Sequence, residues 1–329
     1  MDVIEINEKI AIVIGGAGFI GCNLICEIVK SYKEVYCIDN FSRGSSDYFD
    51  AVNCVDHVNI IECDASDVSD LSRAFGSIKL NAHQVEIWHL AANSDIPAGV
   101  DNINVDLNDT FLTTVSILEV MKSHHFKTLF FASSSAVYGD HGSNPLHETM
   151  GSLSPISNYG AMKLSSEAII CAAYEAFLNT AVIFRFPNVV GFPATHGVIY
   201  DFVKKLNASS SDLEVLGDGS QRKAYLHVSD LISAMLYIRD NDERKETPSI
   251  YNIGPVDDGI FVRDIAAIVV KAYGGNIKLN FGIGNRGWVG DVPKFVYSTD
   301  KLQKLGWKPL MSSTQAIVRA ASEIVKQLT

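Results

Sequence analysis

Tyr159 and Lys163 lie four residues apart in a segment whose composition favours a helix. This spacing places a phenol and an ammonium group on the same helix face. Because a nearby cation stabilises a phenolate, we expect Lys163 to lower the pKa of Tyr159 and make it a general base. The same pair also occurs by chance on helix surfaces, so the surrounding motifs decide whether it is catalytic.

Three consecutive serines, Ser133, Ser134 and Ser135, provide further reactive groups. They follow an apolar segment at residues 128–132, which we expect to be a buried strand. Ligands of parallel sheets bind at the carboxyl ends of the strands. One hydroxyl could therefore hydrogen-bond a substrate oxygen as it loses or gains a proton, while at least one other is expected to cap a helix or form a turn.

A glycine run after the first expected strand (residues 9–14) predicts a dinucleotide site. Its G-x-x-G-x-x-G spacing at Gly15, Gly18 and Gly21 precedes a helix expected over residues 19–30. In this context the first glycine allows a tight turn, the second lets the backbone approach a phosphate, and the third lets the helix pack closely. The helix N-terminus then offers N–H groups to a pyrophosphate. The same glycine run could instead serve only the packing of the helix against the strand, because ordinary strand–helix connections also use glycine-rich turns.

Asp39 ends the second expected strand, at residues 35–38. An acid at this position accepts hydrogen bonds from ribose hydroxyls and repels a 2′-phosphate, which favours NAD over NADP. Asp39 could instead be a turn residue before Asn40, and Arg43 could bind a phosphate. Asp64 follows the third strand (residues 58–63) and is expected either to contact adenine or to cap the next helix.

Strands and helices alternate through the first half of the chain, with strands expected at residues 85–90 and 181–186 and helices at residues 106–123 and 157–178. This alternation predicts an α/β fold with a doubly wound parallel (Rossmann) sheet. After residue 187, turns rich in Gly, Pro and Asp predict a smaller mixed α/β domain. A helix at residues 227–239 and a strand at residues 250–253 should return to the sheet. We therefore expect an NAD-binding domain at 1–187 and 226–254, and a substrate-binding domain at 188–225 and 255–329.

The composition excludes several classes of partner. The 329 residues carry a formal net charge of −11, which argues against binding to nucleic acid or to a membrane surface. Six cysteines without C-x-x-C spacing fit reduced thiols in the cytoplasm. The acidic N-terminus does not resemble a signal peptide, and no histidine spacing indicates a metal site, so no metal is expected.

The segment at residues 157–178 is so rich in small and apolar residues that we expect it to be covered on two sides. A second copy of the chain is one way to cover the outer side. We therefore expect a homodimer through a helix bundle formed near residues 106–123 and 157–178.

Taken together, the chain resembles the extended short-chain dehydrogenases/reductases, in the nucleotide-sugar epimerase group typified by UDP-glucose 4-epimerase. The matching segments run in order along nearly the whole sequence, which makes the resemblance specific. They are residues 15–21, 39–40, 89–92, 133–139, 159–163, 184–191, 217–219, 227–228 and 305–307.

The resemblance implies a catalytic set of Ser134, Tyr159 and Lys163, with Lys163 holding the nicotinamide ribose. It implies NAD as cofactor, bound by Gly15, Gly18, Phe19, Ile20, Gly21, Asp39, Asn40, Asp64, Ala65, Leu90, Ala91, Ala92, Tyr159, Lys163 and Pro187. It implies substrate contacts from Ser94, Ser134, Ser135, Tyr159, Asn188, Arg222, Lys223, Arg286 and Phe295.

The activity implied by the resemblance is 4-epimerisation of a nucleotide sugar, with a UDP-hexose favoured. Tyr159 would take the C4 hydroxyl proton while NAD takes the C4 hydride, and the 4-keto sugar would turn over before the hydride returns. Related dehydratases and decarboxylases carry acids directly after the catalytic Ser/Thr, where this chain has Ser135 and Ala136. Two other functions fit the same sequence features. One is a nucleotide-sugar dehydrogenase or reductase with the same triad, and the other is a non-catalytic NAD-binding regulator.

The chain departs from the family pattern at several positions. Lys223, beside Arg222, stands where the family has an arginine that grips the pyrophosphate, and lysine lacks the bidentate fork. Trp288 replaces another arginine, with Arg286 two residues earlier. Arg222, Lys223 and Arg286 could form a basic pocket or could be solvated surface charges. Phe295 hints at a hexose without a substituent at C2. Thr110 replaces an asparagine at the start of the expected dimer helix, and the sequence does not explain this change.

Overall fold

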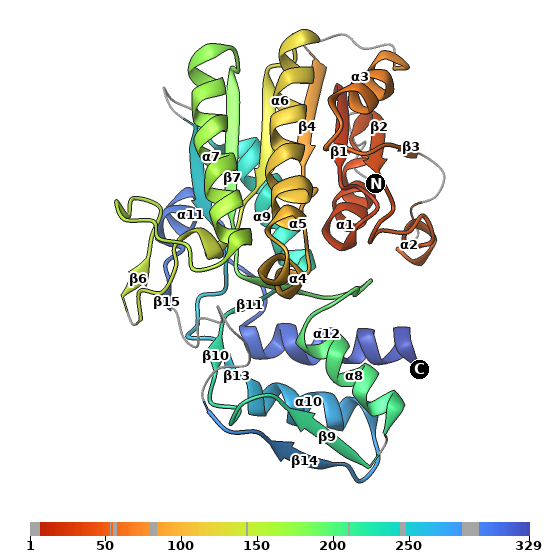
Figure 1. Cartoon of the computed structure of the whole chain (residues 1–329), viewed down its shortest axis with the longest axis vertical. Helices are drawn as coiled ribbons and strands as arrows, with labels where there is room; N and C mark the ends of the chain where they lie inside the picture. The colour runs from red at the N-terminus through yellow and green to blue at the C-terminus, as the bar shows by residue number, and fades with distance from the viewer. Residues whose placement is uncertain are drawn as a thin grey trace. The chain divides into compact units, whose positions relative to one another are not determined.

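Seven strands form one parallel sheet in the order β12-β7-β5-β4-β1-β2-β3 (Figure 1). The structure is a computed structural model that describes residues 7–52, 54, 58–78, 84–142, 144–209, 211–243, 248–284 and 296–329. The strands of this sheet are β1 (Asn7–Ile14), β2 (Tyr32–Asp39), β3 (Val58–Glu62), β4 (Val85–His89), β5 (Thr128–Ala132), β7 (Thr180–Arg185) and β12 (Ser249–Asn252). The predicted doubly wound sheet is confirmed.

The chain divides into two compact units. Unit 1 comprises residues 1–137, 157–185 and 242–250, and unit 2 comprises residues 138–156, 186–241 and 251–329. The helices of unit 1 are α1 (Phe19–Ile28), α2 (Asp47–Ala51), α3 (Val68–Gly76), α4 (Ile96–Asp101), α5 (Ile103–Asp106), α6 (Thr113–Ser123) and α7 (Asn158–Ala176). A short 3₁₀ helix, Ser135–Val137, follows β5.

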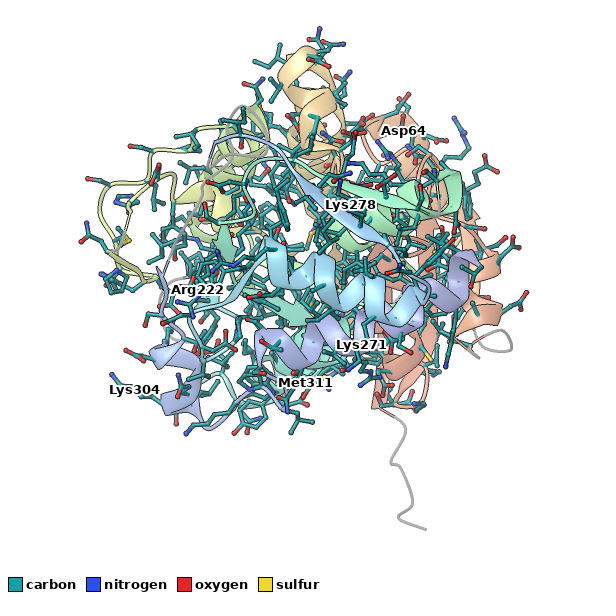
Figure 2. All side chains as sticks on the ribbon, turned by 90° about the horizontal axis from the view of Figure 1, so that it is seen from below. Asp64, Arg222, Lys271, Lys278, Lys304 and Met311 are labelled. Atoms are coloured by element: carbon teal, nitrogen blue, oxygen red, sulfur yellow. The ribbon has the colours of Figure 1, made fainter. Side chains whose placement is uncertain are left out.

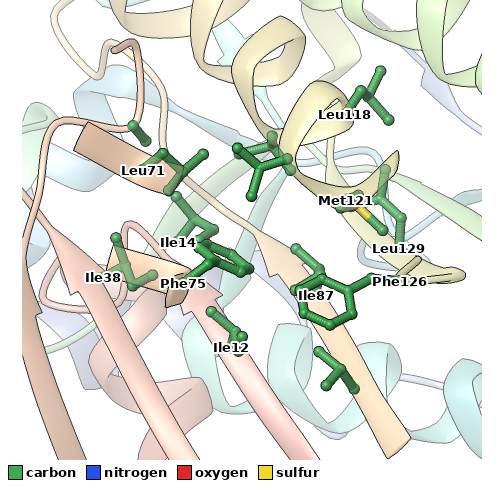
Figure 3. Packing of buried hydrophobic residues seen from close by; sticks show 14 of the residues in the cluster. Ile12, Ile14, Ile38, Leu71, Phe75, Ile87, Leu118, Met121, Phe126 and Leu129 are labelled. Carbon is green, nitrogen blue, oxygen red and sulfur yellow. The ribbon is translucent and has the colours of Figure 1, made fainter. Parts of the chain in front are cut away.

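Apolar residues of α3, α6 and α7 pack on one face of the sheet and form the core of unit 1 (Figure 3). Leu71 and Phe75 on α3 and Met121 on α6 lie over isoleucines of β1 and β4, and all are fully buried. Aromatic side chains of β4, β5 and β7 stack beside one another, with the rings of Trp88 and Phe130 4.1 Å apart. The apolar runs that predicted these strands therefore reflect burial on both faces of a parallel sheet.

The helix expected over residues 106–123 is helical throughout in the structure, but a π-helical segment interrupts its α-helical hydrogen bonding. The structure places α5, a π-helix at Leu107–Leu112 and then α6 in this region. Thr110 is fully buried within the π-helix, and its hydroxyl accepts a hydrogen bond of 3.1 Å from the backbone N–H of Asn93. The altered hydrogen bonding of a π-helix thus gives Thr110 a role that the sequence pattern did not reveal.

Unit 2 has its own core, built from α8 (Val198–Ala208), α10 (Val262–Tyr273) and α12 (Ser313–Leu328) with the parallel pair β9 (Asp212–Val215) and β14 (Lys278–Phe281). Its other elements are β6 (Pro145–Leu146), β8 (Asn188–Val190), β10 (Arg222–Lys223), β11 (Tyr225–His227), α9 (Val228–Asn241), β13 (Ile260–Phe261), β15 (Val296–Tyr297) and α11 (Asp300–Leu305). Among the described residues, no helix is long and apolar enough to cross a membrane.

Candidate active site

The glycine turn lies where the strand order reverses between β1 and β4, at the carboxyl ends of both strands. Sheets of this kind bind ligands at such a point. The backbone N–H groups of Leu90 and Ala91 both donate to the carbonyl of Ile14, at 2.8 and 2.9 Å, and tie the two strand ends together. Predicted cofactor residues from two separate strands are therefore neighbours in unit 1.

Gly15 and Gly21 of this turn leave no room for side chains. Gly15 has a φ of +78°, and a Cβ on it would lie 2.6 Å from the backbone nitrogen of Ala91. A Cβ on Gly21 would lie 2.3 Å from the carbonyl oxygen of Gly15. At Gly18 a Cβ would meet the same oxygen at an ordinary 3.4 Å, so the turn is least crowded there. This close backbone cradle fits the diphosphate of a dinucleotide.

Helix α1 begins directly after Gly18, with no side-chain cap at its N-terminus. A helix start of this kind leaves the first N–H groups, among them those of Phe19 and Ile20, for an anion. The Asp39 carboxylate accepts from the backbone N–H of Ala17 at 3.0 Å and of Phe41 at 2.9 Å. Asp39 is therefore a turn residue, and its remaining lone pairs suit ribose hydroxyls.

The other residues around the predicted adenosine site also form turns. Asn40 accepts from the N–H of Ser42, and Asp64 accepts from both the N–H and the hydroxyl of Ser66. The cap of α3 is Asp67, so the capping alternative for Asp64 is wrong. Arg43 pairs with Asp95 at 2.8 Å, which engages the guanidinium that could have bound a phosphate.

Ser134, Tyr159 and Lys163 meet at the carboxyl end of β5, all within unit 1. The Ser134 hydroxyl hydrogen-bonds the Tyr159 phenol. Lys163 is fully buried, and its Nζ donates to the carbonyl of Ala132 at 2.6 Å. Its Nζ also lies 5.9 Å from the centroid of the Tyr159 ring. The predicted phenol, ammonium and hydroxyl are therefore assembled at one place.

The predicted lowering of the Tyr159 pKa is wrong for the folded chain. Burial raises the pKa of Tyr159 to about 12, although the hydrogen bond from Ser134 opposes this change. The nearby Asp106 carboxyl also raises the pKa of Tyr159. Burial lowers the pKa of Lys163 to about 7, while the negative charge of Glu167 opposes that decrease. For both groups desolvation is the largest effect on the pKa, and it favours the neutral form.

The sequence reasoning missed a buried ion pair directly behind these residues. Arg185 donates to the Glu167 carboxylate from Nε at 2.9 Å and from Nη2 at 2.5 Å. The Ser133 hydroxyl donates to the same carboxylate at 2.5 Å. An arginine within the apolar segment at residues 181–186 was the available signal, because a buried charge requires a partner.

A second polar network was missed beside α5. The Asn93 side chain donates to the carbonyl oxygen of Asp95 and to Asp106 Oδ1, each at 2.8 Å. Asp106 is fully buried, and its Oδ2 has no hydrogen-bond partner among the described residues. Gly99 is required beside it, since a Cβ there would lie 1.8 Å from Oδ2. Burial raises the pKa of Asp106.

The predicted substrate residues are divided between the two units. Ser94 and Ser135 are partly buried in unit 1, and Ser135 begins the 3₁₀ helix after Ser134. Asn188 is exposed at the start of β8 in unit 2. Arg286 and Phe295 lie outside the described residues.

Arg222 and Lys223 form the short strand β10 of unit 2, where consecutive side chains point to opposite faces. The Arg222 guanidinium donates to Asp258 at 3.3 Å and lies 5.2 Å from the ring centroid of Phe261 (Figure 2 labels Arg222). This geometry ties Arg222 to β13 and to the residues just before it. It gives no support to a pocket in which Arg222 and Lys223 point the same way.

Two histidines that lie beside apolar residues in the sequence, His89 and His227, are hydrogen-bonded. His227 is bonded to Ser229 at 2.8 Å and to Glu323 at 3.1 Å, and His89 Nε2 is bonded to Thr114 at 2.9 Å. Within the described parts of the chain, no three His, Cys, Asp or Glu side chains are grouped as metal ligands. All six cysteines are free thiols.

Comparison with known proteins agrees with this geometry. The model of the NAD dependent epimerase/dehydratase family matches residues 11–254. The UDP-glucose 4-epimerase of Corynebacterium glutamicum is 27% identical over 327 residues, covering 94% of each chain. The UDP-N-acetyl-alpha-D-glucosaminuronate decarboxylase of Bacillus cytotoxicus is 31% identical over 260 residues, covering 76% of each chain.

Among solved structures, a crystal structure of UDP-galactose 4-epimerase is 34% identical, with a TM-score of 0.83. The match covers 98% of this chain and all of that one. The family model spans most of the sequence, including the glycine turn and the Ser134, Tyr159 and Lys163 set. The chain therefore belongs to the NAD dependent epimerase/dehydratase family.

Proposed function

We propose that this protein is an NAD-dependent nucleotide-sugar epimerase that inverts C4 of a UDP-hexose. The observation that carries the proposal is the meeting of Ser134, Tyr159 and Lys163 in the unit that holds the glycine cradle. The names of the three similar proteins reported above all include a UDP sugar, and two are 4-epimerases. These names support the choice of nucleotide and of reaction.

The cofactor would be held by the glycine turn, the Asp39 carboxylate and the backbone at Leu90 and Ala91. When bound, NAD supplies an acceptor for the C4 hydride and the donor that returns it. Tyr159 takes the proton of the C4 hydroxyl as the carbon is oxidised, and Ser134 hydrogen-bonds the same oxygen. After the keto sugar has turned, Tyr159 gives the proton back while C4 is reduced from its other face. Lys163 holds the nicotinamide ribose and offsets the negative charge on Tyr159.

The residues after Ser134 favour epimerisation over the related reactions. Elimination of water and decarboxylation use an acidic side chain there, and this chain has Ser135 and Ala136. The second candidate is a reductase of a nucleotide-linked keto sugar, which needs the same three catalytic residues. It would consume added NADH or NADPH in proportion to product, whereas an epimerase needs none.

We propose that the UDP-hexose is bound by a set of polar, charged and aromatic side chains, namely Ser94, Ser135, Asn188, Arg222, Lys223, Arg286 and Phe295. Pro187, Ala65 and Ala92 are proposed to complete the NAD site. We also propose that the chain has an NAD-binding domain at 1–187 and 226–254 and a substrate-binding domain at 188–225 and 255–329.

We further propose that the protein is a cytoplasmic homodimer. Supporting the dimer, partly exposed apolar side chains lie on the π-helix, α6 and α7, among them Phe111, Val115 and Leu164. Burial of such a face against its copy would remove apolar area from water. Sedimentation equilibrium tests this directly, since a monomer at micromolar concentration would contradict it.

The activity is tested with purified protein and a panel of UDP-, GDP-, CDP- and dTDP-hexoses without added reductant. NMR should show interconversion of the C4 epimers of a UDP-hexose. The Tyr159→Phe variant should retain the fold and lose turnover, and unchanged turnover in that variant would contradict the mechanism. Stoichiometric use of NADH or NADPH would instead identify the reductase.

A further inference from the structure

Three consecutive residues at the carboxyl end of β5 contact three residues spaced one turn apart on α7. The carbonyl of Ala132 accepts from Lys163, and the Ser133 hydroxyl donates to Glu167. Ser134, the next residue, hydrogen-bonds Tyr159. The three contacts together fix the position of the strand end along the helix, so displacement at one contact displaces the other two.

Glu167 is held in place by a residue of a third element, Arg185 of β7. Its side chain is 5% exposed, and it accepts two hydrogen bonds from Arg185, whose side chain is 3% exposed. The backbone N–H of Ser133 also donates at 2.8 Å to the carbonyl of Phe184, the residue before Arg185. The ends of β5 and β7 and the middle of α7 are therefore joined at this carboxylate.

The charge of Glu167 acts on Lys163, one helical turn earlier. Lys163 is completely buried, and burial alone disfavours its ammonium form. The ionisable groups around it are Tyr159 and Glu167 on α7, His89 on β4 and, beyond them, Arg185 on β7 and Asp106 on α5. Glu167 is the neighbour whose charge favours the ammonium form.

We propose that Glu167 is a positioning residue of the active site. Held by Arg185, it fixes Ser133 and thereby sets Ser134 against Tyr159, and it places a carboxylate one helical turn from Lys163. The inference rests on the proposed function for its catalytic consequence. The effect on Lys163 is a property of the protein itself and needs no substrate.

The direct test measures the titration of Lys163 in the purified holoenzyme. The ¹³Cε resonance of isotopically labelled lysine reports protonation, and the Lys163 signal is identified by its loss in Lys163→Met. Glu167→Gln keeps the size of the side chain and removes its charge, and its NH2 group replaces one of the two oxygens that accept from Arg185. We expect the half-titration pH of Lys163 to fall by about one unit. An unchanged half-titration pH would overturn the electrostatic role.

Two conservative variants separate charge from geometry. Glu167→Asp keeps the charge with a shorter reach, so Lys163 should titrate near its original pH while kcat falls. Ser133→Ala removes one hydrogen bond and keeps both charges, so kcat should fall severalfold with no change in the Lys163 titration. A normal kcat in Ser133→Ala would overturn the positioning role. Glu175→Gln, an exposed change on the same helix, is the matched control.

Glu167→Gln leaves Arg185 without its buried partner and could prevent folding. The double variant Glu167→Gln/Arg185→Met removes both charges and avoids that penalty, and a smaller fall in the half-titration pH is expected, because loss of the Arg185 positive charge favours the ammonium form of Lys163. In the epimerase assay, the alkaline limb of the kcat–pH profile should move to lower pH with Lys163. If the wild-type protein has no epimerase activity, the proposed function fails while the Lys163 titration still decides this inference.

Discussion

The carbonyl oxygen of Gly15 lies 2.3 Å from the position that a Cβ on Gly21 would occupy. Gly21→Ala must therefore push α1 away from the glycine turn. We expect the free energy of unfolding to fall by about 1–3 kcal/mol, as in other overpacked sites. NAD affinity measured by calorimetry should fall at least tenfold. The control is Gly76→Ala at the end of α3, where a Cβ meets nothing within 4 Å, and both quantities should be retained.

Asp39 should decide between NAD and NADP. Its carboxylate caps the turn through Ala17 and Phe41, and its charge would repel a 2′-phosphate. Asp39→Asn keeps the shape and removes the charge, so the ratio of NAD to NADP affinity should fall about tenfold, a change of about 1.4 kcal/mol. Binding titrations with both cofactors measure this ratio. Asp47→Asn, an exposed change of the same kind, should leave it unchanged.

Lys163 should destabilise the folded protein in a pH-dependent way. Its pKa falls from 10.5 to about 7 on folding, so between these values the unfolded state binds more protons. The free energy of unfolding from this group then rises with pH, by about 1.4 kcal/mol per unit. Lys163→Met removes the penalty. Its stability advantage over the wild type should be largest near pH 7 and shrink toward pH 10 in urea denaturation. If the difference in unfolding free energy between Lys163→Met and the wild type were constant across this range, folding would not lower the pKa of Lys163.

Local patterns in the sequence were enough to predict the strands of the parallel sheet, the glycine turn and the Tyr159/Lys163 pair, whereas the choice of Ser134 depended on the family resemblance. Apolar β-branched runs specify buried parallel strands, and the turn needs glycines at fixed offsets because side chains there would collide. Tyr159 and Lys163 share a helix face through spacing alone. The positions of Ser134 and Lys163 at the end of β5 follow from these elements.

The features that could not be predicted depend on burial between segments far apart in the sequence. Glu167 and Arg185 form a pair only because α7 packs beside β7, and Asn93 reaches Asp106 only across the π-helix region. The pKa of Tyr159 was predicted with the wrong direction for the same reason. Spacing indicated the nearby cation, whereas the stronger effect of desolvation appears only in the folded chain.

Ser134 should contribute to turnover and little to cofactor binding. Its hydroxyl bonds Tyr159 and accepts from the N–H of Ala136, and neither of these partners belongs to the glycine turn. In Ser134→Ala we expect kcat to fall about 10²-fold, within the range of acid–base groups, with unchanged NAD affinity. Ser165→Ala on α7 removes a hydroxyl bonded only to its own helix and is the control. If Ser134→Ala also lowered NAD affinity, Ser134 would contribute to cofactor binding as well as to turnover, and this prediction would be wrong.

Asp106 should oppose ionisation of Tyr159. Its carboxyl is fully buried, accepts from Asn93 through Oδ1, and raises the pKa of the phenol. Asp106→Asn removes the negative charge while keeping the shape beside Gly99, so the phenol should ionise at lower pH, by on the order of half a unit. Absorbance difference titration against Tyr159→Phe measures the shift, and Asp101→Asn at the exposed end of α4 should produce none. An unshifted phenol in Asp106→Asn would mean that the carboxyl is already protonated in the folded protein.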